Sequence, residues 1–98
     1  MNEKLKIDSS FIDEFCTKHA INYLGLFGSF ARNEQTPTSD VDVLVDFDHP
    51  QSLFGLSRIK SALETQLGKP VDLVTRNSLK PTIKSHIEKD IRTLYEKR

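Results

Sequence analysis

The sequence predicts a small α/β (α+β) fold, in which helices pack on a three-stranded, mixed sheet. Three short apolar segments have the character of strands, and segments of helical periodicity stand around and between them. The expected order is helix, strand, short helix, strand, helix, strand, helix, and this alternation is typical of a sheet covered by helices. The chain has 98 residues, a length that favours one domain over residues 1–98.

The first helix is expected at residues 9–19. Its apolar side chains recur at the spacing of one helix face, and Ser10 followed three residues later by Asp13 forms a weak capping box at its start. Residues 23–27 then form a short apolar strand that ends at Gly28, as expected for a strand that runs into a tight turn.

A turn and a polar loop are expected between the first and second strands. Residues 29–32 have the character of the first turn of a short helix, and residues 33–38, which include Pro37, are expected to form a loop. Asn33 suits this turn because asparagine tolerates a left-handed backbone better than most residues. Residues 41–47 are the clearest strand, since apolar side chains occupy every second position.

The second half of the chain is expected to form a helix, a strand and a long final helix. Residues 52–67 carry apolar side chains every three or four positions, and Gly68 and Pro70 end this helix. Residues 71–74 form a short strand, and Pro81 fits only the first turn of the helix that follows. This last helix is predicted from one apolar stripe, formed by Leu79, Ile83, Ile87, Ile91 and Leu94.

Composition excludes several classes of function. Lysine and arginine balance aspartate and glutamate at 14 each, so no net field draws the protein to nucleic acid, which is not an expected partner. No segment is long and apolar enough to span a membrane, and no membrane association is expected. Cys16, the single cysteine, fits a reducing cytoplasm and is expected to be a core residue rather than a nucleophile. The histidines lack metal-ligand spacing and are expected at the surface or in helix packing: His19, His49 and His86.

The first feature that carries chemistry is the pair Gly28-Ser29. A glycine at a strand end lets the backbone turn sharply and approach a ligand closely. If a helix begins there, its free N–H groups and its dipole favour a phosphate, and the Ser29 hydroxyl adds a donor. Taken alone, a Gly-Ser pair is more often only a turn.

Three aspartates form the second feature. Asp40 and Asp42 stand two positions apart at the start of a strand, so they point to the same face. Carboxylates this close repel each other unless a cation joins them, and such oxygen ligands suit Mg²⁺. Asp72 lies in a short apolar strand, and if that strand adjoins residues 41–47, the three acids converge. They could then hold one or two metal ions and activate a hydroxyl for attack on phosphorus. The alternative is that each acid is simply exposed to water.

In this order, the features resemble the nucleotidyltransferase superfamily that includes DNA polymerase beta, and this implies a nucleotidyltransferase-type fold. The family pattern is Gly-Ser, a short spacer, Asp-x-Asp on a strand and an acid on a later strand. The corresponding segments here are GSFAR at 28–32 and SDVDVLV at 39–45, followed by Asp72. From about Ile12 to Tyr95, the chain is similar to the minimal nucleotidyltransferases (MNT) of prokaryotes.

The resemblance implies a role for each matched residue. Gly28 and Ser29 match the phosphate-binding turn, and Asp40 and Asp42 match metal ligands. Asp72 matches the third carboxylate, which acts as a base or as a ligand of a second metal ion. Arg32 matches an arginine that usually follows the turn. It either binds phosphate or pairs with a carboxylate of the site and only holds the turn, and both roles stay open.

The resemblance also implies an activity and a partner. The reaction is a magnesium-dependent transfer of a nucleoside monophosphate, with AMP as the first candidate, from ATP or another nucleoside triphosphate to an acceptor hydroxyl. Minimal members often work beside a separately encoded HEPN protein, a ribonuclease toxin. The nucleotidyltransferase silences it as an antitoxin, in some pairs by attaching AMP to a tyrosine. The stripe of the final helix is expected either to dock such a partner or to pack on the chain's own sheet.

Two other functions stay open. A non-catalytic antitoxin would neutralise its partner by direct binding. A nucleotidyltransferase that modifies a small molecule is less favoured, because the chain is too short for the additional substrate domain of larger members. The sequence does not specify the acceptor, the nucleotide base or the oligomeric state, and a homo-oligomer is compatible with it.

Overall fold

The structure, a computed structural model, describes residues 7–97 apart from residues 33, 35 and 37. The expectations for Asn33 and Pro37 therefore fall outside the described residues. The elements follow one another as α1 (Ser9–Lys18), β1 (Ile21–Phe27), β2 (Val41–Phe47), α2 (Leu53–Leu67), β3 (Val71–Thr75), the 3-10 turn η1 (Arg76–Ser78), α3 (Pro81–Asp90) and β4 (Arg92–Glu96). None of the helices in this part of the chain is long and apolar enough to cross a membrane.

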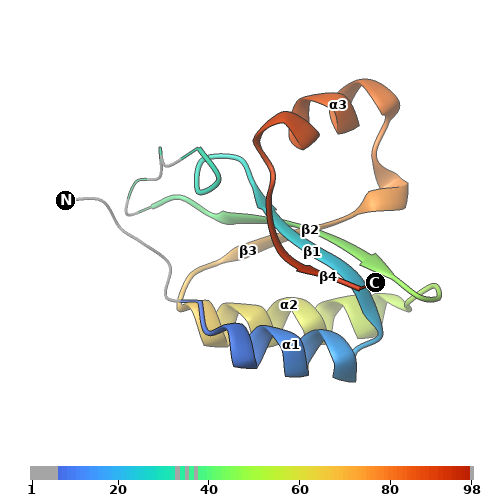
Figure 1. Ribbon diagram of the computed structural model, residues 1–98. Coiled ribbons are helices and arrows are strands. Elements are labelled where there is room, and N and C mark those ends of the chain that lie inside the picture. The colour runs from blue at the N-terminus through green and yellow to red at the C-terminus, as the bar shows by residue number, and fades with distance from the viewer. Residues whose placement is uncertain (1–6, 33, 35, 37, 98) are drawn as a thin grey trace.

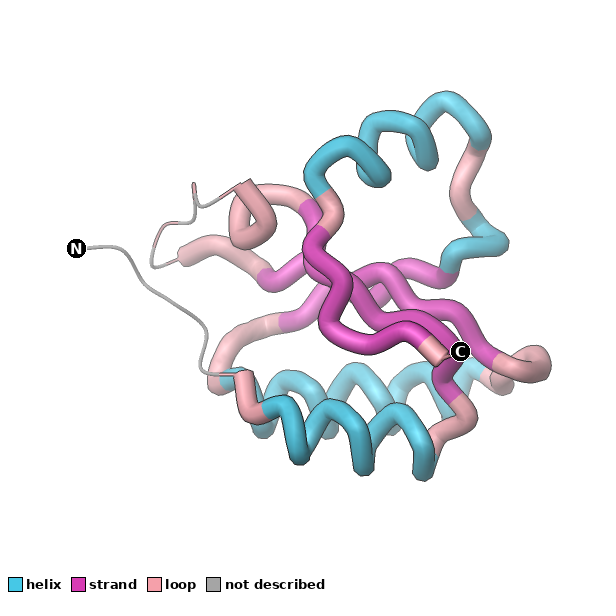
Figure 2. The backbone as a smooth tube through the Cα atoms, viewed as in Figure 1, coloured by secondary structure: helices cyan, strands magenta, loops and turns pink. Residues whose placement is uncertain are grey.

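A mixed sheet forms the centre of the fold. Within the described residues it has four strands in the order β3-β2-β1-β4, so the α/β class is confirmed but the predicted count of three strands is wrong. β1 runs antiparallel to both β2 and β4, and β2 runs parallel to β3. Helices α1 and α2 lie against one face of the sheet, and α3 stands on the opposite side (Figures 1 and 2).

The core lies between the sheet and the pair α1 and α2. The alternation predicted for residues 41–47 is confirmed, because the three valines of β2 are buried on this face. Removing such apolar side chains from water stabilises the fold by about 25 cal/mol for each Å² buried. The buried residues of this core are Ile12, Phe15, Cys16, Ile21, Leu24, Leu26, Phe30, Val41, Val43, Val45, Ile59, Leu63 and Val71.

Both helices under the sheet begin at a side-chain cap. The Asp8 carboxylate accepts a hydrogen bond from the Ser10 backbone N–H at 2.9 Å. The predicted capping box of Ser10 with Asp13 is therefore wrong, because the cap lies two residues earlier and leaves Ser10 inside the first turn. Ser52 caps α2 by accepting from a backbone N–H three residues on, at 3.0 Å. Such caps satisfy N–H groups that have no partner within the helix.

The long final helix predicted from the C-terminal stripe is wrong. α3 ends at Asp90, Ile91 adopts extended backbone angles, and the chain continues as β4. β4 pairs antiparallel with β1, where Tyr95 lies opposite Leu24. Without β4, β1 would present an unpaired row of backbone groups. The hydrogen bonds of this edge, together with the strand preference of threonine and tyrosine, outweigh the helical spacing of the stripe.

The side of the sheet that faces α3 is called the α3 face below. On β2 it is formed by the residues that alternate with the buried valines, namely Asp42, Leu44 and Asp46. Because paired residues of neighbouring strands share a face, Asp72 of β3 and Phe27 of β1 also belong to it. The acids that the sequence singled out on β2 and β3 therefore lie on the face that α1 and α2 leave uncovered.

Candidate functional site

The turn after β1 approaches β2 closely. Gly28 has a positive φ of 73°, a conformation that glycine adopts without steric cost. A β-carbon built at Gly28 would overlap the Oδ2 atom of Asp42. Two facts of this turn, its backbone angle and its contact with Asp42, therefore require glycine.

Residues 29–32 form one turn and not the start of a helix. The backbone N–H of Arg32 donates to the Gly28 carbonyl at 3.1 Å, and the N–H of Glu34 donates to the Ser29 carbonyl at 2.8 Å. No helix follows in the described part of this loop, so that expectation is wrong. The reason is that the polar residues after the turn have no apolar face to bury, and a single helical turn is unstable without one.

Asp42 and Asp72 are neighbours across the parallel pair β2 and β3, at the end of the sheet where both strands begin. Asp42 is half-buried and Asp72 is exposed. Burial raises the pKa of Asp42, and the negative charges of Asp72 and Asp40 raise it further, whereas Arg32 lowers it. The charges of Asp72 and Asp40 thus act on the carboxylate of Asp42.

The charges converge, but the ligand geometry of a metal site is not formed. No group of three or more His, Cys, Asp or Glu side chains in the described residues is arranged to hold a metal ion. The chemistry of the donor set nevertheless suits a hard cation, since carboxylate oxygens are the ligands that Mg²⁺ takes from proteins. The repulsion that raises the pKa of Asp42 is also what a divalent cation would relieve.

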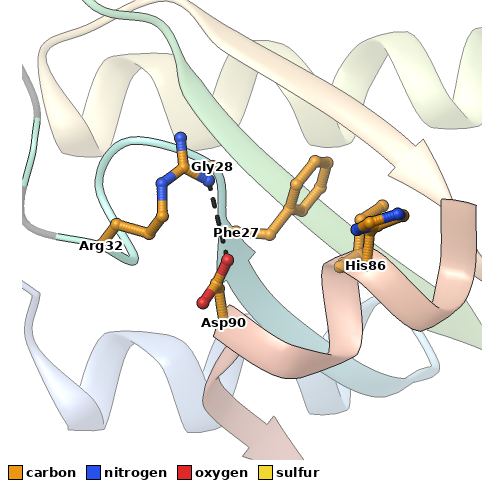
Figure 3. A pocket seen from close by; sticks show the side chains of 6 residues that line it. Phe27, Gly28, Arg32, His86 and Asp90 are labelled. Atoms are coloured by element: carbon orange, nitrogen blue, oxygen red, sulfur yellow. Dashed lines mark ion pairs between the residues drawn. The ribbon is translucent and has the colours of Figure 1, made fainter.

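Arg32 connects the turn to the end of α3. Its Nε atom lies 3.3 Å from Glu34 Oε1, and its Nη1 atom lies 3.8 Å from Asp90 Oδ2 (Figure 3). All three side chains are well exposed, so these ion pairs add little to stability. Arg32 therefore pairs with acids other than Asp40, Asp42 and Asp72, and it affects Asp42 only through its charge.

A cavity of about 200 Å³ lies between this turn and α3. Figure 3 shows the side chains that bound it, from the end of β1, from the turn and from α3. No sequence motif predicted this cavity, and His86 was expected only at the surface or in helix packing. The sequence does contain a signal for these lining residues, because His86 and Asp90 are one helical turn apart and so share a face of α3. The lining residues are Phe27, Gly28, Arg32, His86, Ile87 and Asp90.

A buried tyrosine supports the α3 face farther along β1. The Tyr23 hydroxyl shares a hydrogen bond of 2.7 Å with Thr93 Oγ1, which ties β1 to β4. The Arg76 guanidinium stacks 4.2 Å from the centre of the ring. The ring lies over Gly25, where an added β-carbon would come within 2.9 Å of it. No sequence motif marks Tyr23, and its role follows only from the pairing of β1 with β4.

Sequence comparisons find relatives along most of the chain. A family model described as a nucleotidyltransferase domain matches residues 9–94. A protein of Methanocaldococcus jannaschii, named as a candidate protein adenylyltransferase, is 50% identical over 70 residues, which cover 71% of this chain and 75% of the relative. The protein adenylyltransferase MntA of Thermococcus cleftensis is 37% identical over 78 residues, which cover 80% of this chain and 79% of the relative.

Solved structures share the fold. One, described as a candidate minimal nucleotidyltransferase, has a TM-score of 0.75 and 32% identity, and the match covers 86% of each chain. Another is an MNT antitoxin of Shewanella oneidensis in complex with a tri-AMPylated HEPN toxin. It has a TM-score of 0.67 and 18% identity, and the match covers 90% of this chain and 69% of that one. At that identity the second likeness concerns the fold alone.

Proposed function

The chain belongs to the family of nucleotidyltransferase domains, and from that premise we propose that it is a magnesium-dependent protein adenylyltransferase. It transfers AMP from ATP to a tyrosine hydroxyl of a HEPN-type toxin and so acts as an antitoxin. The observation that carries the proposal is the meeting of the Gly28 turn, Asp42 and Asp72 at one edge of the sheet. The relatives named as protein adenylyltransferases support a protein acceptor.

In this proposal the turn binds the phosphates. The positive φ of Gly28 lets the backbone approach a ligand closely, and the Ser29 hydroxyl donates a hydrogen bond to a phosphate oxygen. Arg32 is 44% exposed at its side chain, and its ion-pair partners among the described residues are two solvated acids. Its guanidinium is therefore free to exchange them for a phosphate, whose negative charge is greater. Phosphate binding is the role we assign to Arg32.

The three aspartates hold the metal and prepare the acceptor. Asp40 and Asp42 are the proposed Mg²⁺ ligands, with Asp72 completing the set. When bound, Mg²⁺ neutralises the phosphates and stabilises the charge of the transition state. Asp72 is exposed beside the half-buried Asp42, so an incoming hydroxyl can reach its carboxylate. It takes the hydroxyl proton as the new oxygen–phosphorus bond forms and the bond to pyrophosphate breaks.

The position of the site favours a large acceptor. Asp72 lies on β3, an edge strand of the sheet, and its side chain is open to solvent. An acceptor that is itself part of a folded protein can reach such an exposed carboxylate, whereas a small molecule would need further walls to hold it. The relatives named as protein adenylyltransferases support the same class of acceptor.

One observation favours a second candidate function. The described carboxylates are not arranged to hold a metal ion, as would be expected of an antitoxin that neutralises its toxin by binding alone. The double variant Asp40→Asn with Asp42→Asn separates the two functions, because it keeps the size of both side chains and removes their charge. Asp46→Asn, on the same face of β2, is the matched control.

Two assays are needed. In the first, each purified variant is incubated with labelled ATP, Mg²⁺ and the HEPN-type partner, and transfer of the label is measured. In the second, growth is measured for cells that express the variant together with the partner. Metal stabilisation of a transition state is worth several kcal/mol, and each ~1.4 kcal/mol is about tenfold in rate. We therefore expect the double variant to lose label transfer by orders of magnitude and to lose protection, while the control keeps both. Full protection by the double variant, without transfer, would establish the binding-only function instead.

A further inference from the structure

The cavity between the Gly28 turn and α3 adjoins the proposed phosphate site. Gly28 is part of its wall, and Phe27 pairs in register with Asp42, so Phe27 projects from the same face as the proposed catalytic carboxylates. In a nucleoside triphosphate the nucleoside is joined covalently to the phosphate that reacts. Its binding site must therefore lie directly beside the phosphate site, as this cavity does.

Two other cavities lined by described residues do not meet this requirement. One, of about 270 Å³, is lined by Phe47, His49 and other residues at the far end of β2. Phe47 is five positions from Asp42 along the strand, which is about 16 Å at ~3.3 Å per residue. Another is lined by residues of α1, such as Asp13 and Thr17, on the opposite side of the sheet (Figure 1).

The lining has the chemistry of a nucleobase site. Phe27 and Ile87 provide apolar surface, and Phe27 offers a ring on which a base can stack. His86 and Asp90 stand at the α3 side of the same space (Figure 3), where an imidazole and a carboxylate can bond to the edge of a base. Apolar walls with a few polar groups are typical of small-molecule sites. The volume of about 200 Å³ suits part of a nucleotide and not a protein segment.

We infer that this cavity binds the nucleoside part of the triphosphate, with His86 and Ile87 of α3 as determinants of nucleotide affinity. The inference rests on the proposed function. The acceptor hydroxyl is not a suitable occupant, because attacking and leaving oxygens lie in line on opposite sides of the phosphorus. Gly28 belongs both to the cavity wall and to the turn that binds the leaving phosphates. The cavity therefore lies on the triphosphate side of the reacting phosphorus and not on the side of the acceptor.

The test compares two probes, ATP and inorganic triphosphate, by calorimetric titration of the full chain in Mg²⁺. The variants are His86→Ala and Ile87→Ala, and the matched control is His49→Ala, whose side chain lies at the distant cavity. α3 has no buried residue, so these changes leave the core intact, and a melting curve for each variant checks this. We expect each α3 variant to bind ATP roughly tenfold more weakly, as for the loss of one good contact, and to bind triphosphate unchanged.

The outcomes separate this inference from the proposed function. Equal weakening for both probes, or no change in either, would overturn the inference and leave the proposed function in place. Unchanged ATP affinity with slower AMP transfer to the partner would also overturn it, because the cavity would then serve the acceptor. If the parent chain binds neither probe, the proposed function itself fails, and the inference fails with it.

Discussion

The carboxylate of Asp42 fills the space in which a side chain at residue 28 would begin. Its Oδ2 atom would overlap a β-carbon built on Gly28. This contact joins the end of β1 to the start of β2, where Phe27 pairs with Asp42. The proposed phosphate turn and the proposed metal ligand are thus positioned by the same contact, and a change in one displaces the other.

Replacing Gly28 by alanine should destabilise the fold more than the same change at Gly68. Both glycines have nearly the same positive φ, 73° and 71°, so both changes carry a strain of order 1–3 kcal/mol. Only at Gly28 does the new carbon meet another side chain, since no atom lies within 4 Å of one at Gly68. Urea unfolding of both variants measures the difference, and equal losses would show that Asp42 moves aside at no cost.

Asp42→Asn should raise the stability of the protein in the absence of metal and nucleotide. The folded pKa of Asp42 is raised by burial and by the charges of Asp72 and Asp40. Folding therefore disfavours its ionised form, and the parent loses stability as the pH rises through the range in which Asp42 ionises. The advantage of the asparagine should be present at neutral pH and vanish in acid, below the ordinary pKa of an aspartate.

Thermal melting across pH measures this effect, with Asp46→Asn as the control. Asp46 lies on the same face of the same strand as Asp42, farther along β2 from Asp40 and Asp72. A neutral-pH gain in Asp46→Asn equal to that of Asp42→Asn would mean that the effect comes from net charge and not from the convergence of the three carboxylates. Mg²⁺ with ATP should stabilise the parent by mass action and should not stabilise Asp42→Asn.

Tyr23→Phe should lower the free energy of unfolding by about 1 kcal/mol, the usual net value of one hydrogen bond. The change removes the hydroxyl that bonds to Thr93 at 2.7 Å and leaves the ring in place over Gly25. Tyr95→Phe is the control, because the structure shows no hydrogen bond from its hydroxyl to another described residue. A loss in Tyr95→Phe as large as that in Tyr23→Phe would argue against the bond between β1 and β4 as the cause.

Cys16 should resist alkylation in the folded protein at pH 8. Its side chain is buried, and burial together with the charge of Asp13 raises the pKa of the thiol to about 12. The reactive thiolate is therefore scarce and shielded. Mass spectrometry after iodoacetamide treatment should find the thiol free, whereas the same treatment in urea should modify it. Rapid modification without urea would contradict its place in the core.

Elements with a strong local pattern were predictable from the sequence. The alternation of valines identified β2, and apolar spacing ended by Gly68 and Pro70 identified α2. β4 was not predictable, because Leu94 continues a helical stripe and only its pairing with a strand near the other end of the chain makes it extended. Local propensity is a weak signal where a distant partner decides the structure.

The candidate site also contains residues that the sequence motif predicts and residues that only the tertiary arrangement brings together. The sequence motif contains Gly28, Ser29, Asp40 and Asp42 at a characteristic spacing, followed by Asp72 on a later strand. The structure places the turn beside Asp42 and pairs Asp42 with Asp72. His86 and Asp90 have no such spacing to the motif. Their nearness to Gly28 depends on how α3 crosses the α3 face, and the sequence predicted α3 as part of a longer helix.

The pairing of β4 with β1 has a consequence for how the protein folds. The pairing of Leu24 with Tyr95 joins residues from nearly opposite ends of the chain, whereas β1 and β2 are joined by a far shorter segment. Since the entropy of loop closure grows with loop length and distant pairings slow folding, β4 is expected to join last. Until then β1 has an open edge that can pair with another unfinished chain. The concentration of newly made chains, more than the stability of the finished sheet, then governs how much protein escapes aggregation.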